Sequence, residues 1–162
     1  MDAVLDAWAR DIAVEETQNA IFVGGAAKRV TLDAVRIVHR APHSGSAAPA
    51  DFSISGTQIP IDRCSVQGEG TWPLATQAEV TGPIVVLNMT TDERGVSPHQ
   101  RWATGLLVDS SKFANSTRGA PGIAFSNRKT AGSGHGWDIG WAVARNVSAP
   151  YLVVQQPPGT IN

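Results

Sequence analysis

The sequence predicts an all-β protein, a right-handed parallel β-helix of about seven coils that forms a single domain over residues 1–162. Three observations predict this fold class. A short pattern that contains Asp or Asn recurs along the chain, helical periodicity is missing beyond the first residues, and loops rich in Gly and Ser separate short apolar runs. With 42% hydrophobic and 17% charged residues, the chain can bury a core.

Each repeat has a few alternating apolar residues, then Asp or Asn, then a second short alternating run. In residues 31–37, Leu32 precedes Asp33, and Val35 and Ile37 follow it. Asp and Asn tolerate the left-handed backbone region and hydrogen-bond to nearby backbone, as a sharp corner between two strands requires. We therefore interpret these positions as corner residues. The markers are Asp11, Asp33, Asp62, Asn88, Asp109, Asn127 and Asn146.

The markers lie between 18 and 29 residues apart. This uneven spacing fits a coil of about 20 residues that insertions lengthen in places. Val4, Leu5, Trp8 and Ile12 also fit one amphipathic helix, but residues 8–13 match residues 143–148, which favours a first coil. The main competing fold is an antiparallel sandwich. A sandwich does not predict Asp or Asn at a similar place in seven units.

The insertions nearly all follow the second run of a repeat, so we expect them on one face of the solenoid. All four histidines and three of the five tryptophans lie in or beside these loops. Strands about 4.8 Å apart would bring consecutive loops into side-chain contact. A groove lined by His, Arg and Trp is therefore predicted. The loops are residues 39–45, 69–73, 94–102, 115–119 and 132–138.

Such a groove suits a carbohydrate ligand, above all an acidic one. Trp faces pack against sugar rings, and Arg pairs with carboxylates in a fork geometry. The predicted partner is thus a polysaccharide or oligosaccharide. The candidate substrate-binding residues are Gln100, Trp102, Trp137, Trp72, His43 and Arg118.

The candidate catalytic residues are His99, Arg101 and His135. A polysaccharide lyase removes a proton next to a carboxylate whose charge is neutralised, and a His base with an Arg can do this near neutral pH. His135, between two glycines, is the candidate partner acid or base. A glycoside hydrolase is the alternative, because Asp92, Glu93 and Asp138 lie near the same loops. A non-catalytic module that binds glycans or self-assembles is the third hypothesis.

Two blocks of sequence resemble pectate-lyase-like β-helix proteins. They are residues 98–109, which read Pro-His-Gln-Arg-Trp-Ala-Thr-Gly-Leu-Leu-Val-Asp, and residues 132–137, Gly-Ser-Gly-His-Gly-Trp. The resemblance implies a right-handed parallel β-helix, usually secreted and associated with polysaccharide breakdown. Members of that group are normally several times longer. A solenoid this short exposes core at its ends, so we expect a homo-oligomer formed through the coil ends.

Composition and motifs exclude several other classes. Cys64 is the single cysteine, which excludes an intrachain disulfide. The net charge of -1 without a basic cluster argues against nucleic acid, and the apolar runs are too short to cross a membrane. No motif predicts a metal or another cofactor. The first residues do not form a signal peptide, so localisation stays open, with secretion expected if the chain is part of a longer one.

Overall fold

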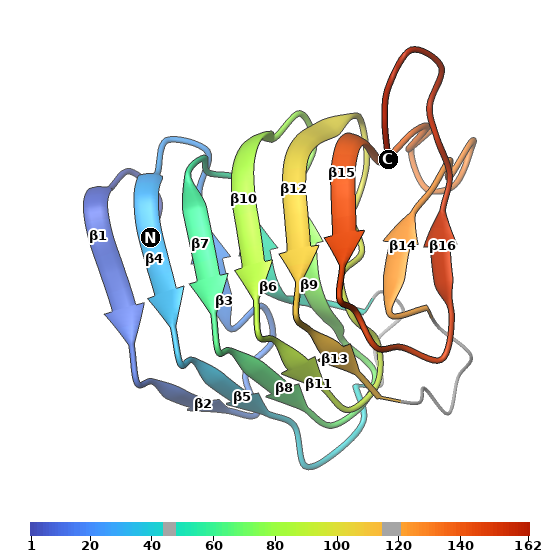
Figure 1. Cartoon of the computed structure of the whole chain (residues 1–162). Coiled ribbons are helices and arrows are strands. Elements are labelled where there is room, and N and C mark those ends of the chain that lie inside the picture. The colour runs from blue at the N-terminus through green and yellow to red at the C-terminus, as the bar shows by residue number, and fades with distance from the viewer. Residues whose placement is uncertain (44–47, 115–120) are drawn as a thin grey trace.

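The computed structural model describes residues 1–43, 48–114 and 121–162. It confirms the predicted fold class, because three parallel sheets wind around one axis as a right-handed β-helix (Figure 1). Sheet A contains β1 (Leu5–Arg10), β4 (Lys28–Asp33), β7 (Ile59–Asp62), β10 (Thr81–Leu87), β12 (Ala103–Asp109) and β15 (Ile139–Arg145). Sheet B contains β2 (Ala13–Glu15), β5 (Arg36–Val38), β8 (Ser65–Gln67), β11 (Thr90–Thr91) and β13 (Lys112–Phe113). Sheet C contains β3 (Ile21–Val23), β6 (Ala50–Ile54), β9 (Trp72–Thr76), β14 (Ile123–Phe125) and β16 (Leu152–Val154).

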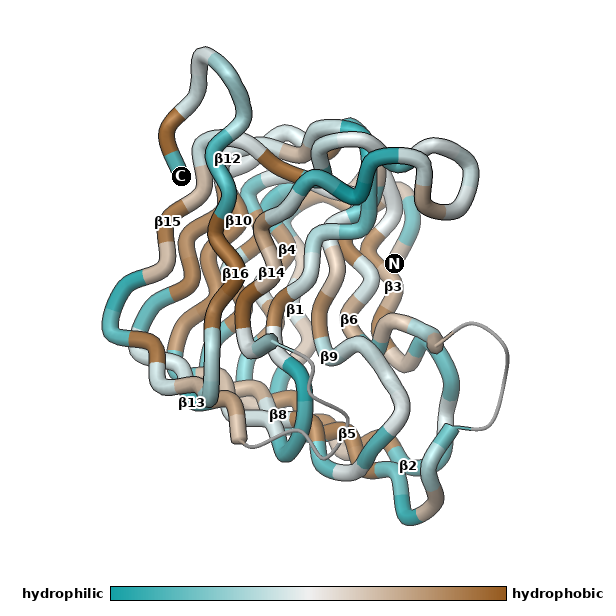
Figure 2. Tube along the Cα trace, turned by 90° about the vertical axis from the view of Figure 1, so that its right-hand side faces the viewer, coloured by the Kyte–Doolittle hydropathy of each residue, from teal (hydrophilic) through white to brown (hydrophobic). Residues whose placement is uncertain are grey.

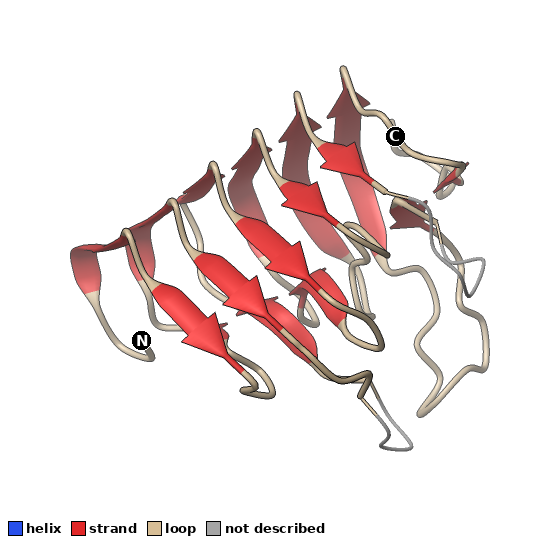
Figure 3. Ribbon diagram, turned by 90° about the horizontal axis from the view of Figure 1, so that it is seen from below, coloured by secondary structure: helices blue, strands red, loops and turns tan. Residues whose placement is uncertain are grey.

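Each coil contributes one strand to sheet A, then passes through sheet B and sheet C. The strands of sheet B run side by side along one wall of the solenoid (Figure 3). In sheet C, single bridges through Val96 join β9 to β14, so this wall continues from the first coil to the last. The first predicted coil is confirmed, since β1 and β2 occupy the residues for which a helix was the alternative.

The core is built from rows of apolar side chains that stack from coil to coil. In sheet A, Leu32 pairs with Ile61, Ile61 with Val86, and Val86 with Val108, and all four are fully buried. Apolar segments of all three walls surround this interior (Figure 2). The stacking explains the alternation in the sequence, because in a strand every second side chain points to the same side.

The corner between sheets A and B takes one residue with a positive φ in every coil. These residues are Asp11, Ala34, Arg63, Asn88, Ser110 and Asn146, with φ between 51° and 55°. Three of the predicted markers are among them. The other corner positions carry Ala, Arg or Ser, so the corner is imposed by the stacked backbone even where the side chain does not favour it.

Asp33, Asp62 and Asp109 were predicted as corner residues, and this interpretation is wrong. Each one ends a strand of sheet A, one position before the residue with positive φ. Their carboxylates instead accept hydrogen bonds from the next coil. Arg63 donates to Asp33 at 2.6 and 2.8 Å, Asn88 to Asp62 at 2.8 Å, and Asn146 to Asp109 at 3.2 Å. Asp is therefore repeated here because it links coils.

The marker Asn127 does not lie at this corner either. It forms an antiparallel bridge with Trp137, within a hairpin of residues 126–138 that connects β14 to β15. The described residues therefore form six coils, with six strands in sheet A, in place of about seven. The hairpin is an insertion in the fifth coil, and it carries Arg128 and His135.

Candidate functional site

Among the described residues, the predicted loops gather at two corners of the coil and not on one face, which corrects the sequence interpretation. Residues 39–43 and 68–71 connect sheet B to sheet C, and we call this side the B–C corner. Residues 97–102 and 126–138 connect sheet C to sheet A, at the C–A corner. The sequence pattern had predicted both sets at the same phase of the repeat. The four histidines are therefore divided into two pairs.

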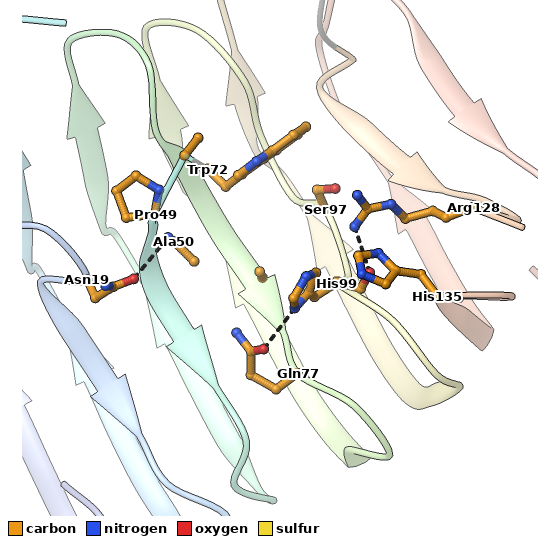
Figure 4. Close-up of a pocket in the computed structure, with 11 residues that line it drawn as sticks. Asn19, Pro49, Ala50, Trp72, Gln77, Ser97, His99, Arg128 and His135 are labelled. Atoms are coloured by element: carbon orange, nitrogen blue, oxygen red, sulfur yellow. Dashed lines mark hydrogen bonds between the residues drawn. The ribbon is translucent and has the colours of Figure 1, made fainter. Parts of the chain in front are cut away.

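A cavity of about 380 Å³ lies over the outer face of sheet C and ends at the C–A corner. Its residues come from five successive coils, so it runs along the axis of the solenoid (Figure 4). Strands about 4.8 Å apart give it a length of roughly 19 Å over four coil steps. It is lined by Asn19, Ala48, Pro49, Ala50, Trp72, Ala75, Gln77, Ser97, His99, Arg128 and His135.

His99 is held on three sides. Its backbone N–H donates to the Thr76 carbonyl at 2.8 Å, and its own carbonyl accepts a bond from Arg128 Nη1 at 2.8 Å. Its ring Nδ1 lies 3.1 Å from Gln77 Oε1. The side chain is half-buried and faces the cavity. A histidine fixed in this way presents one ring edge to a ligand in a set orientation.

The His135 ring packs edge-to-face against the His99 ring in the lining of the cavity. The ring centroids are 4.9 Å apart at an interplanar angle of 79°, and Figure 4 shows the two imidazoles side by side. His135 is buried, and its Nδ1 has no hydrogen-bond partner among the described residues. A Cβ at Gly132 would lie only 2.2 Å from His135 Nε2. The absent side chain at position 132 therefore leaves the room that the imidazole occupies.

Arg128 supplies the cationic group of the cavity and was not among the predicted site residues. Arg128 directly follows the marker Asn127 and precedes the Gly-rich run of residues 132–136, and this position in the sequence was a usable signal. The predicted cation, Arg101, is exposed and does not line the cavity. Its guanidinium donates to Ser133 Oγ at 2.6 Å, which ties the loop to the hairpin.

Both imidazoles of the C–A corner are held in the neutral form near neutral pH. Burial lowers the pKa of His99, and the charges of His135, Arg128 and Arg101 lower it further. Burial also lowers the pKa of His135, with Arg128 and Arg101 acting in the same direction. A neutral imidazole beside a guanidinium can accept a proton while the guanidinium holds an anion.

The predicted substrate-binding residues are distributed over several places. Trp72 lines the cavity, and the Arg94 guanidinium lies 4.3 Å from its ring centroid. Gln100 follows His99 and has a buried Oε1 without a partner among the described residues. Trp102 packs against Trp141 with ring centroids 6.3 Å apart, and its backbone N–H donates to the Trp137 carbonyl. Arg118 lies outside the described residues.

His43 belongs to a second, polar cavity at the B–C corner, with a volume of about 190 Å³. His39 and Thr71 also line it, and both bind the buried Asp51 beneath. His39 Nε2 lies 2.9 Å from Asp51 Oδ1, and Thr71 donates to Asp51 Oδ2 at 2.6 Å. Burial raises the pKa of Asp51, while Thr71 and His39 lower it. This network anchors the loop that carries His43.

The three carboxylates of the hydrolase alternative are divided between the corners. Asp92 and Glu93 accept hydrogen bonds from the backbone N–H groups of Gly68 and Gly70. Asp138 accepts bonds from the backbone N–H and the hydroxyl of Ser126, at the base of the hairpin. Burial raises the pKa of Asp138 to about 7. These carboxylates hold loops, and none of them lines the main cavity.

Comparison of the chain with protein-family models, with curated proteins and with solved structures finds no match. The resemblance to pectate-lyase-like proteins therefore stays a hypothesis that rests on the two sequence blocks. Over the described ranges no helix is long and apolar enough to span a membrane. Within the same ranges, no three His, Cys, Asp or Glu side chains gather closely enough to hold a metal ion.

Proposed function

We propose that this β-helix binds an acidic polysaccharide along sheet C and cleaves it as a lyase at the C–A corner. The observation that carries the proposal is the pairing of His99 with Arg128 at one end of an elongated cavity. Trp72 and Pro49 supply apolar surface further along the cavity, where sugar rings can pack. The function thus keeps the predicted chemistry but assigns the carboxylate-binding role to Arg128 in place of Arg101.

The proposed reaction is a β-elimination. His99 takes the proton from the carbon that bears the carboxylate, and the released electron pair forms a double bond to the neighbouring carbon. The bond from that neighbour to the glycosidic oxygen breaks, and the oxygen leaves with a proton from water or from the protonated His99. Arg128 binds the carboxylate and stabilises the negative charge that grows on it during proton removal.

The test is an ultraviolet assay on a panel of polyuronates and glycosaminoglycans, because elimination leaves an absorbing double bond. We expect absorbance from one class of uronate polymer and none from the same polymer after its carboxylates are reduced to alcohols. The acidic limb of the pH–rate profile should lie below 6.5, since His99 has a lowered pKa. Cleavage without absorbance would assign a hydrolase, and the absence of any cleavage would overturn the enzymatic proposal.

A non-catalytic module that self-associates is a second proposal, which exposed apolar side chains on the outermost coils favour. Trp8 on β1 is 71% exposed, and Val143 on β15 is 52% exposed. One backbone group of the β15 edge is already paired within the chain, since Ala142 N–H donates to Asn162 Oδ1 at 3.1 Å. Contacts of the exposed apolar side chains, and not strand pairing at this position, would therefore join the copies. Sedimentation of the chain tests this proposal. A concentration-independent monomer would contradict it, whatever the lyase assay shows.

A further inference from the structure

Three polar side chains from three successive coils form a continuous row on the outer face of sheet C. Ser53 belongs to β6, Gln77 follows β9, and His99 lies in the next coil before β12. Gln77 Nε2 lies 2.8 Å from Ser53 Oγ, and Gln77 Oε1 lies 3.1 Å from His99 Nδ1. The second of these contacts ends on the imidazole that faces the cavity, and Figure 4 shows the Gln77 and His99 side chains joined by it.

The backbone ladder places these side chains in line. Gln77 N–H donates to the Ile54 carbonyl, and His99 N–H donates to the Thr76 carbonyl, both at 2.8 Å. Each bond connects one coil to the next, about 4.8 Å further along the axis. The side chains are therefore aligned by the same stacking that builds the core, before any ligand is present.

The hydrogen bonds along the row run in one direction, because the nitrogen and the oxygen of the Gln77 amide have different roles. The amide nitrogen only donates and the amide oxygen only accepts. With its nitrogen on Ser53, Gln77 offers its oxygen to His99, so the proton of the neutral imidazole is on Nδ1. The lone pair is then on Nε2, the only ring nitrogen left to accept a proton.

We propose that Gln77 is a positioning residue that fixes His99 as the Nδ1–H tautomer and leaves Nε2 as the base. The catalytic part of this inference rests on the proposed lyase function, whereas the tautomer does not. His135 is no equivalent candidate, because its Nδ1 is buried without a partner among the described residues.

An amide suits this role better than a carboxylate. A carboxylate beside Nδ1 would stabilise the protonated imidazole and raise the pKa of His99. The groups that face His99 are His135, Arg128 and Arg101, and all of them act to lower that pKa. A neutral amide orients the ring without opposing these charges, so the imidazole stays available as a base.

Nitrogen-15 NMR of histidine-labelled protein tests the tautomer directly, without any substrate. We expect the Nδ1–H form at His99 in the wild type above its pKa. Gln77→Leu removes the acceptor and should release the ring to a tautomer mixture. Gln77→Glu keeps an acceptor, so it should retain the Nδ1–H form and raise the pKa of His99. Ser53→Ala, which removes only the far end of the row, should weaken the tautomer preference less than Gln77→Leu does.

On the substrate that the ultraviolet assay selects, Gln77→Leu should lower kcat about 10-fold or more and change KM by less, because the main effect is on proton removal. Gln77→Glu should restore much of kcat, with the acidic limb moved to higher pH. An Nε2–H tautomer in the wild type, or a tautomer that Gln77→Leu does not change, would overturn the inference. A confirmed tautomer without turnover of any glycan would uphold the role of Gln77 in setting the tautomer and reject the lyase function.

Discussion

His39 and His99 lie at two different corners of the solenoid, and their ring nitrogens bond to different kinds of group. At the B–C corner, His39 bonds to the buried carboxyl of Asp51. At the C–A corner, His99 bonds to an amide, and the charged groups that act on it are His135, Arg128 and Arg101. The guanidinium groups disfavour the protonated ring at His99, whereas the Asp51 carboxyl is a bonding partner that holds the His39 ring in place.

This difference separates a histidine that holds structure from one that is free to react. His39 and Asp51 are nearly inaccessible, with side chains 8% and 0% exposed, and they bond to each other. His99 is half-buried on a cavity that a ligand can enter, and one ring nitrogen is free of protein partners among the described residues. The comparison predicts that removing His39 affects folding and that removing His99 affects chemistry.

The largest expected effect is on turnover. His99→Ala should lower kcat on a cleaved uronate polymer by about 10²- to 10⁴-fold, because it removes the general base. Its melting temperature should change little, since the ring is only half-buried. Thr130→Ala, an exposed change on the neighbouring hairpin, is the matched control and should keep wild-type kcat. Wild-type turnover by His99→Ala would show that the comparison between the corners is wrong.

The opposite pattern is expected at the B–C corner. His39→Ala should reduce the free energy of unfolding by about 3 kcal/mol, because it leaves the buried Asp51 carboxylate without one of its partners. The loss should be smaller at pH 5 than at pH 8, since Asp51 has a raised pKa and protonates as the pH falls. Urea unfolding at the two pH values measures both. A loss below about 1 kcal/mol at pH 8 would contradict an anchoring role.

The buried carboxyl of the hairpin should give a stability that depends on pH. Asp138 has a folded-state pKa of about 7 against 3.8 for the unfolded chain, so its protonated form stabilises the fold. This contribution is complete below 3.8 and is lost as the pH rises through 7. Between pH 5 and pH 8, wild type should lose about 3 kcal/mol relative to Asp138→Asn.

The histidines also make the free energy of unfolding depend on pH, in the direction opposite to Asp138. Because wild type and Asp138→Asn share these histidines, their contribution cancels in the comparison. His99 and His135 have lowered pKa values, so they make the fold less stable as the pH falls through 6.5 and below, in both proteins alike. Parallel stability curves for wild type and Asp138→Asn would mean that Asp138 keeps an ordinary pKa and that the hairpin does not depend on its protonation.

The smallest expected effect is a difference between Ala substitutions at two glycines of the same hairpin. Gly132 and Gly134 both have positive φ, so the backbone strain of Ala should cost about 1 kcal/mol at either position. Only at position 132 does the new Cβ meet the His135 ring, because nothing lies within 4 Å of a Cβ at position 134. Gly132→Ala should therefore shift the NMR signals of His135 and His99, and Gly134→Ala should not. Equal shifts would indicate a general distortion of the hairpin.

The fold was largely predictable because the repeat has a physical cause that local sequence records. Alternating residues such as Leu32 and Val35 indicate strands, and Asp and Asn indicate places where strands end. The exact corner was not predictable, since Ala34 and Arg63 adopt positive φ without a side chain that favours it. Asn127 was mistaken for a marker because its local sequence resembles a corner, although it lies in a hairpin.

The sequence by itself determined that the chain winds into a parallel β-helix and that His99 and His135 lie in insertions between strands. Local periodicity and loop composition suffice for this, because they depend on neighbours along the chain. Only the tertiary structure decided that Arg128 and Gln77 surround His99 while Arg101 is directed to Ser133. Those contacts join different coils, and they depend on the path of each insertion across the stack, which no short segment encodes.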